Sequence, residues 1–131
     1  MRSFDFFQID AFTDQPFTGN PAAVMILDAW LPDTTMVKIA AEHNLAETAF
    51  LVKREAGHYD LRWFTPAVEV PLCGHATLAS AHALYAELGE TTDRLRFETK
   101  SGSLYAERRG DRYSLDLPAD PPQKIDLHPS V

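Results

Sequence analysis

Short apolar runs, most of them broken by single polar residues, follow one another along the chain and predict many strands and two helices. The expected strands are 4–12, 22–27, 47–53, 58–64, 94–99, 103–108 and 112–117. Within 58–64, Tyr59, Leu61 and Trp63 alternate with polar residues, which is the period of a strand with one buried face. The run 22–27 is apolar throughout and favours a strand buried on both faces.

Two segments have the spacing of helices. Apolar residues recur every three to four positions over 35–43, and we expect Asp33 or Thr34 to cap this helix and Asn44 to end it. The second helix is expected over 74–88, with Gly89 at its end. It is apolar on several faces and rich in alanine, which is typical of a buried helix that neighbouring strands approach closely. The pattern as a whole predicts an α+β fold.

The end of the chain differs in composition from the rest. Prolines at 118, 121, 122 and 129 interrupt it, and no hydrophobic repeat is recognised there. We therefore expect residues 1–117 to form one domain and residues 118–131 to be a proline-rich linker or tail.

Composition narrows the classes of function. A net charge of −7 argues against a nucleic-acid partner, because phosphate backbones require clustered Lys and Arg. The single cysteine, Cys73, cannot form an internal disulfide and fits a reducing compartment. The apolar runs are far shorter than the roughly 20 residues of a membrane span, and the N-terminus does not have the pattern of a signal peptide. We expect a cytoplasmic protein that binds neither nucleic acid nor membrane.

The first candidate site is Cys73-Gly74-His75-Ala76-Thr77, at the start of the expected buried helix. A helix N-terminus presents unpaired N–H groups and a partial positive charge, which attract anions. Gly74 allows close approach of a ligand, His75 can shuttle protons, and the position lowers the pKa of a thiol. The residues alone leave an alternative open, namely a buried cysteine beside a capping turn with His75 bonded to the backbone.

Glu47 is the second candidate, because it opens the apolar run 49–52 shortly after a helix. A carboxylate at such a boundary can have a raised pKa and act as a general acid or base, although an ordinary solvated glutamate also fits. The third candidate is the loop 17–21, where the amides of Gly19 and Asn20 can form an anion-binding nest. A simple tight turn is the alternative there.

Cofactor motifs are missing from the sequence. The five histidines include no His-x-x-x-His pair, and one cysteine cannot build a structural zinc site. There is no Gly-x-Ser-x-Gly elbow, and no Gly-x-Gly-x-x-Gly follows a strand. These absences argue against a structural zinc site, a serine hydrolase and a dinucleotide cofactor.

Four ordered motifs resemble the N-terminal half of the phenazine-biosynthesis PhzF-like family. They are Asp10-Ala11-Phe12-Thr13 with Phe17-Thr18-Gly19-Asn20-Pro21-Ala22-Ala23-Val24, Ala46-Glu47-Thr48-Ala49-Phe50, Phe64-Thr65-Pro66, and Leu72-Cys73-Gly74-His75-Ala76-Thr77-Leu78-Ala79. The resemblance covers residues 4–117 and implies one lobe of a diaminopimelate-epimerase-like fold. In that fold each of two similar halves wraps a curved, mostly antiparallel sheet around a central helix, and the active site lies between the halves.

The resemblance also implies a reaction and its residues. It is an isomerisation or epimerisation of a small carboxylated metabolite, by proton abstraction and return without a cofactor. The family's general acid/base falls on Glu47, and its helix-terminal histidine falls on His75. Related epimerases hold a reactive cysteine where Cys73 stands. The expected substrate-binding residues are Gly19, Asn20, Cys73, Gly74 and Ala76.

Full members of the family carry a second half with an Asp-Pro-x-Thr-Gly-Ser motif, which this sequence lacks. The expected partners are therefore a small anionic substrate and either a second lobe or a homodimer partner. Two alternatives stay open. One is a non-catalytic, dimerising remnant that binds a small molecule. The other is a thiol-dependent racemase that uses Cys73 and needs a second, opposing thiol.

Overall fold

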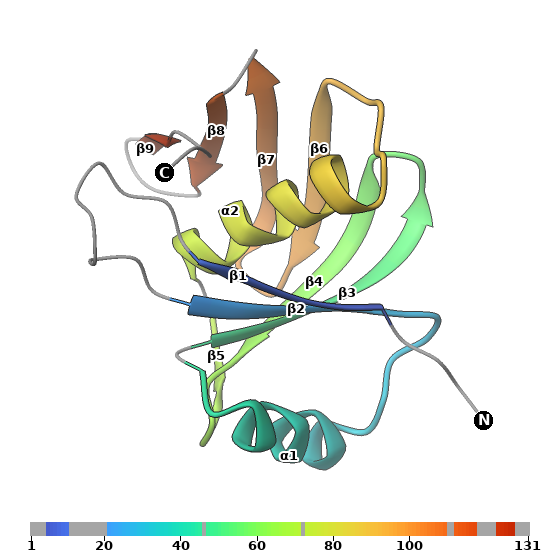
Figure 1. Cartoon of the computed structure of the whole chain (residues 1–131), viewed down its shortest axis with the longest axis vertical. Helices are drawn as coiled ribbons and strands as arrows, with labels where there is room; N and C mark the ends of the chain where they lie inside the picture. Colours follow the sequence, from blue (N-terminus) through green and yellow to red (C-terminus); the bar gives the residue numbers. More distant parts are fainter. Residues whose placement is uncertain are drawn as a thin grey trace.

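The computed structural model describes residues 5–10, 21–45, 47–71, 73–109, 112–117 and 123–127. These residues form one curled sheet with a helix against each of its two faces (Figure 1). The strands are β1 (Asp5–Asp10), β2 (Pro21–Leu27), β3 (Glu47–Glu55), β4 (His58–Phe64), β5 (Glu69–Val70), β6 (Arg94–Thr99), β7 (Gly102–Arg109), β8 (Arg112–Leu117) and β9 (Gln123–Leu127). The helical elements are α1 (Asp33–His43), α2 (Gly74–His82) and a π-helical turn, η1 (Ala83–Glu87).

The strands are ordered β1-β2-β3-β4-β6-β7-β8-β9, and β5 adds to β4. The pairs β2–β3 and β4–β6 are parallel, and the other pairs in the described segments are antiparallel. The predicted α+β lobe, with a curved and mostly antiparallel sheet around a central buried helix, is confirmed.

Helix α2 lies in the concave face of the sheet (Figure 1). Alternate residues of β2, β3, β4 and β6–β8 point at it and form one continuous core, because side chains on a strand alternate between the two faces. Ala76, Ala79, Ala81 and Ala83 of the helical segment are almost completely buried. Their small side chains let the strands approach the helix axis, as the alanine-rich sequence predicts.

Helix α1 covers the opposite face of β2, β3 and β4. Its Met36 and Ala40 pack against Leu27, Phe50 and Phe64 in a second, smaller core. Strands β2 and β3 are therefore buried on both faces, which explains why residues 22–27 are apolar throughout.

The start of α1 differs from the prediction. Pro32 is the N-cap residue, no side chain caps the helix, and Asp33 is already in the first turn. The carboxylate of Asp33 bonds Arg62 of β4 at 3.0 Å instead of capping its own helix, because a long-range cation is within reach. The prediction that Asp33 or Thr34 caps α1 is wrong. The end at Asn44 is confirmed by its left-handed backbone (φ 51°) and its N–H bond to the carbonyl of Ala40.

The predicted helix 74–88 is present, but it changes geometry after His82. Residues Ala83–Glu87 form a wider turn in which the N–H of Leu88 bonds the carbonyl of Ala83 at 3.1 Å. Gly89 follows with φ +69°, in the predicted role of helix terminator. None of the helices in the described segments is both long and apolar enough to cross a bilayer.

Strand β9 lies within residues 118–131, where we expected a linker or tail, and pairs with β8 in antiparallel register. Ile125 and Leu127 alternate with polar neighbours in the sequence, but the run is only five residues long and follows Pro121 and Pro122. Strand β5 has two residues, too few to show a period.

Candidate active site

The first turn of α2 follows an extended residue. Cys73 is the N-cap (φ −147°, ψ 103°), is 8% exposed, and no side chain caps the helix. The first helical hydrogen bond in α2 runs from the N–H of Thr77 to the carbonyl of Cys73, at 3.2 Å. The N–H groups of Gly74, His75 and Ala76 precede any partner within the helix, so their dipoles create positive potential at this end.

A buried chain of hydrogen bonds supports this turn. The Trp63 indole N–H donates to the hydroxyl of Thr77 at 3.0 Å, and that hydroxyl donates to the carbonyl of Cys73 at 2.8 Å. Trp63 and Thr77 are essentially inaccessible to solvent. The start of α2 is therefore bonded to β4 as well as to its own helix.

Glu47 begins β3, is half-buried, and pairs with Ala22 at the beginning of the parallel neighbour β2. Ala49 and Leu51, two and four residues further on, belong to the core around α2. Because side chains alternate along a strand, Glu47 lies on the α2 face of the sheet.

The start of β3 and the start of α2 lie at the same end of the sheet, at the left in Figure 1. Trp63 connects them, because it is opposite Ala49 in the β3–β4 register and bonds Thr77 in α2. The structure therefore brings two predicted site elements, the Glu47 carboxylate and the N-terminus of α2, to one end of the concave face.

The structure describes the other predicted site residues in less detail. His75 is the second residue of α2, and its backbone position is all that the structure describes. Gly74 is half-buried, whereas Ala76 is inaccessible to solvent in this chain, its backbone included. Gly19 and Asn20 lie outside the described residues.

An ionic cluster holds the segment that connects β4 to α2. The guanidinium of Arg62 donates twice to Glu69, at 2.8 and 2.7 Å, and once to Asp33. The rings of Trp30 and Phe64 lie 5.4 and 5.3 Å from the same guanidinium.

The turn between β6 and β7 completes this support. Lys100 donates to Glu69 at 2.8 Å, and the hydroxyl of Ser101 donates to the carbonyl of Pro71, two residues before Cys73, at 2.6 Å. The hydrogen bonds from Arg62, followed by that from Lys100 and the positive charges of both, lower the pKa of Glu69 to about 2 despite its partial burial.

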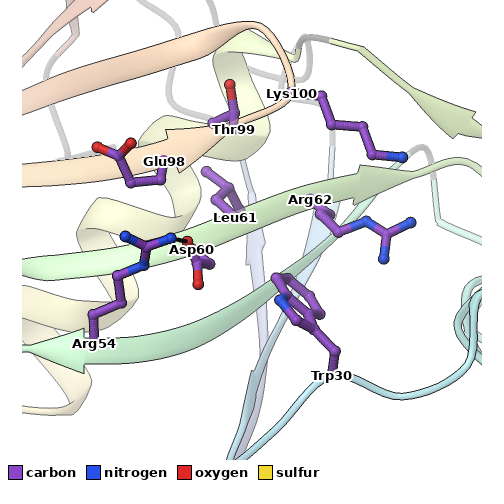
Figure 2. Close-up of a pocket in the computed structure, with 8 residues that line it drawn as sticks. All are labelled: Trp30, Arg54, Asp60, Leu61, Arg62, Glu98, Thr99 and Lys100. Carbon is purple, nitrogen blue, oxygen red and sulfur yellow. Dashed lines mark ion pairs between the residues drawn. The ribbon is translucent and has the colours of Figure 1, made fainter.

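This cluster borders a hollow of about 360 Å³. Figure 2 shows the side chains that line it. The side chains of Asp60 and Arg62 point into it from the face of β4 opposite to α2. Its cations are already paired with carboxylates, Arg54 with Asp60 at 2.8 Å and both Arg62 and Lys100 with Glu69. The hollow is therefore a less suitable anion site than the uncapped end of α2.

Two further contacts that support the site were not predicted from the sequence. The first is His43 at the end of α1, whose Nδ1 lies 3.2 Å from the hydroxyl of Thr48, the residue after Glu47. Burial lowers the pKa of His43, which favours its neutral form. The second is the Arg62–Glu69 pair. Both contacts join residues of different elements, so local spacing carries no signal for them.

The described side chains provide no built metal site. No three His, Cys, Asp or Glu side chains gather closely enough, within the part of the chain that the structure describes, to hold a metal ion. The chemistry that this end of the lobe can perform with its own groups is proton transfer by a carboxylate beside an anion-binding helix terminus.

Comparison with known proteins finds similar sequences and similar structures. A family model described as "Phenazine biosynthesis-like protein" matches residues 9–130. An "Uncharacterized isomerase" of Pseudomonas aeruginosa is 57% identical over 117 residues, which are 89% of this chain and 45% of that protein. A PhzF-family phenazine biosynthesis protein of Enterococcus faecalis, solved by crystallography, has 47% identity and a TM-score of 0.80 over 88% of this chain and 44% of its own.

A "Predicted Epimerase" of Pseudomonas aeruginosa is similar in structure, with a TM-score of 0.70 and 28% identity over 87% of this chain and 43% of its own. The chain spans about half the length of the curated relatives it matches. The family match and the fold lead to one conclusion: this chain belongs to the PhzC-PhzF family of phenazine biosynthesis-like proteins.

Proposed function

We propose that the chain carries the acid/base half of an isomerase or epimerase that acts on a small carboxylated metabolite without a cofactor. The observation that supports this most is the position of Glu47 at the start of β3, on the α2 face and at the same end of the sheet as the α2 N-terminus. A base and an anion-binding site are the two groups that proton transfer beside a carboxylate requires.

In the proposed reaction the Glu47 carboxylate removes a proton from a carbon next to the activated position of the substrate. The electron pair of the broken C–H bond delocalises toward the activating group, and Glu47 is then protonated. Return of that proton to a different carbon gives an isomer. Delivery of a proton by a second acid to the opposite face of the same carbon gives an epimer, after which Glu47 loses its proton to solvent and the second acid regains one. Atoms and charge balance in both cases, with no oxidant or reductant.

The N-terminus of α2 has the complementary role in this proposal. The N–H groups of Gly74 and His75 bind the substrate carboxylate and stabilise the negative charge that develops on proton removal. His75 holds or polarises the same group. Gly19 and Asn20, which precede the first residue of β2, provide further contacts to the anion in this proposal.

The opposite wall of the cleft comes from a second lobe or from a partner chain. The relatives named as isomerases are more than twice as long as the segment they share with this chain, which supports a contribution from outside it. Specificity for one metabolite over another is then shared between the two walls.

Deuterium exchange tests the proposal. A panel of small carboxylates with an acidic C–H near the carboxylate is incubated with the protein in D2O, and deuterium uptake is followed by mass spectrometry. We expect uptake for at least one compound, and a loss of about 100-fold or more in the Glu47→Gln variant. Glu55→Gln is the matched control, because Glu55 ends the same strand and its side chain is 76% exposed. Wild-type protein that exchanges no compound would contradict the proposal, as would a Glu47→Gln variant of full activity.

A second candidate function is a non-catalytic module that binds a small molecule and dimerises. The observation that favours it is the start of α2, where no side chain caps the helix and an anion can bind without any proton transfer. Sedimentation velocity separates the two ideas when it is combined with the exchange assay. A dimer that binds a carboxylate but exchanges no proton supports the binding module, and a stable monomer at micromolar concentration removes its dimerisation.

A further inference from the structure

We propose that Thr77, held by Trp63, is a positioning residue that sets the direction of the Gly74 N–H at the start of α2. This inference rests on the proposed function, in which that N–H binds the substrate carboxylate. It adds two residues to the site that neither touch the substrate nor transfer a proton.

The direction of each hydrogen bond in the chain is determined. An indole N–H can only donate, so the Trp63 bond of 3.0 Å uses a lone pair of the Thr77 oxygen. The single hydroxyl proton of Thr77 is then available for the carbonyl of Cys73, at 2.8 Å. All three groups are buried, which makes each bond costly to leave unmade.

The carbonyl of Cys73 accepts two bonds from the same residue, because the backbone N–H of Thr77 also reaches it, at 3.2 Å. Two donors in different directions hold this carbonyl more firmly than the helical bond alone. The carbonyl of Cys73 and the N–H of Gly74 belong to one planar peptide unit. A fixed carbonyl therefore fixes the N–H, which in a trans peptide points the opposite way, out of the helix terminus.

The hydrogen bonds from Trp63 to Thr77 and from Thr77 to Cys73 also set the distance between Glu47 and the N-terminus of α2. Trp63 lies opposite Ala49 in the sheet register, two residues from Glu47 on the same face. Its indole thus connects the strand pair that carries the base to the helix that carries the anion site. Loss of this connection should disturb the alignment of Glu47 with the α2 terminus and weaken binding of the substrate carboxylate, while the rest of the core stays packed.

The chain contains a matched control for this role. Ser80 is also fully buried, and its hydroxyl donates to the carbonyl of Ala76 at 2.8 Å, one turn further along α2. Its bond has the geometry of the Thr77–Cys73 bond but lies away from the helix terminus. Ser80→Ala measures what the loss of such a bond costs the helix without affecting the proposed site.

Backbone amide hydrogen exchange, followed by NMR, is the test. In Thr77→Val we expect exchange of the Gly74 to Thr77 amides to rise about tenfold relative to amides near Ser80, and the Trp63 indole signal to shift. Thr77→Ser keeps the hydroxyl and should stay within about twofold of wild type. Ser80→Ala should leave the amides of Gly74, His75 and Ala76 unchanged, because the carbonyl that it releases belongs to the peptide unit of the Thr77 amide. A uniform rise at every amide in Thr77→Val, or no change at the first turn, would overturn the inference.

Deuterium uptake by the carboxylate panel separates this inference from the proposed function. We expect Thr77→Val to lower uptake about tenfold and Thr77→Ser to retain it. If the wild type exchanges no compound, the proposed function fails, and the amide measurement still decides whether Thr77 positions the terminus. If Thr77→Val alters the first turn but leaves substrate exchange at the wild-type rate, the positioning role is wrong and the proposed function stands.

Discussion

Removal of the charge on Glu69 should destabilise the lobe through the segment that leads into α2. Glu69 accepts two hydrogen bonds from Arg62 and one from Lys100, and its pKa falls from 4.5 to about 2. A shift of this size corresponds to about 3 kcal/mol in favour of the charged form in the folded state. The side chain is 21% exposed, and solvent screening reduces the expected contribution to about 1–2 kcal/mol.

The sign of the pH dependence follows from the lowered pKa. Above about pH 4.5, Glu69 is charged in both the folded and the unfolded chain, and its full contribution is present. As the pH falls toward 2, the unfolded chain takes up the proton first, and the contribution is lost. Glu69→Gln should therefore lower the free energy of unfolding by about 1–2 kcal/mol at pH 7 and by much less near pH 2.

Urea denaturation followed by circular dichroism, at pH 7 and at pH 3, provides the measurement. Glu55→Gln is the control, since its 76% exposed side chain should contribute little at either pH. Equal stability of wild type and Glu69→Gln at pH 7 would show that the ion pairs of Glu69 do not stabilise the folded chain. A difference between them that grows, rather than shrinks, as the medium becomes more acidic would contradict the lowered pKa of Glu69.

Two further substitutions test the packing. Met36→Ala should lower the free energy of unfolding by about 2–4 kcal/mol in urea denaturation, because Met36 is fully buried between α1 and the sheet, and an unchanged midpoint would contradict this packing. Gly57→Ala should cost about 1 kcal/mol or more in the same assay, because Gly57 has φ +74° and an added Cβ would lie 2.8 Å from the hydroxyl of Thr92. An alanine variant as stable as wild type would show that this turn adjusts freely.

The sequence predicts best those elements in which apolar residues recur with the regular spacing of a strand or a helix. Strands β4, β6 and β8 have the predicted bounds, since their apolar residues alternate and one face meets α2. The alanine-rich segment after Cys73 is buried as predicted over residues 76–81 and 83–85, whereas residues 86–88 at its end are exposed.

The differences have physical causes that a local pattern does not carry. Asp33 has the residue type of a cap, but a bond to Arg62, 29 positions away, replaces that role. The π-helical turn at Ala83–Glu87 contains three consecutive buried residues, and its apolar spacing does not differ from that of an α-helix. Strand β9 pairs with the edge of β8 that β7 does not occupy. A run of five residues between prolines is too short to predict that pairing.

For the candidate site, the sequence led to a hypothesis about the residues but carried no signal for the contacts that hold them. Glu47 and the Cys73–Thr77 segment were recognised by motif, and their common face and end of the sheet follow from the observed register. The bond between Trp63 and Thr77 depends on the packing of a helix against a strand pair, so only a three-dimensional structure could reveal it.

In the proposed reaction Glu47 transfers a proton to and from a carbon of a bound carboxylate substrate. The most direct test of this transfer is the initial rate of deuterium uptake from D2O by a single responding compound, with wild type, Glu47→Gln and Glu55→Gln measured in parallel. We predict that Glu47→Gln loses about 100-fold or more while Glu55→Gln stays within about twofold of wild type. Equal rates for Glu47→Gln and wild type would contradict the role of Glu47 in proton transfer.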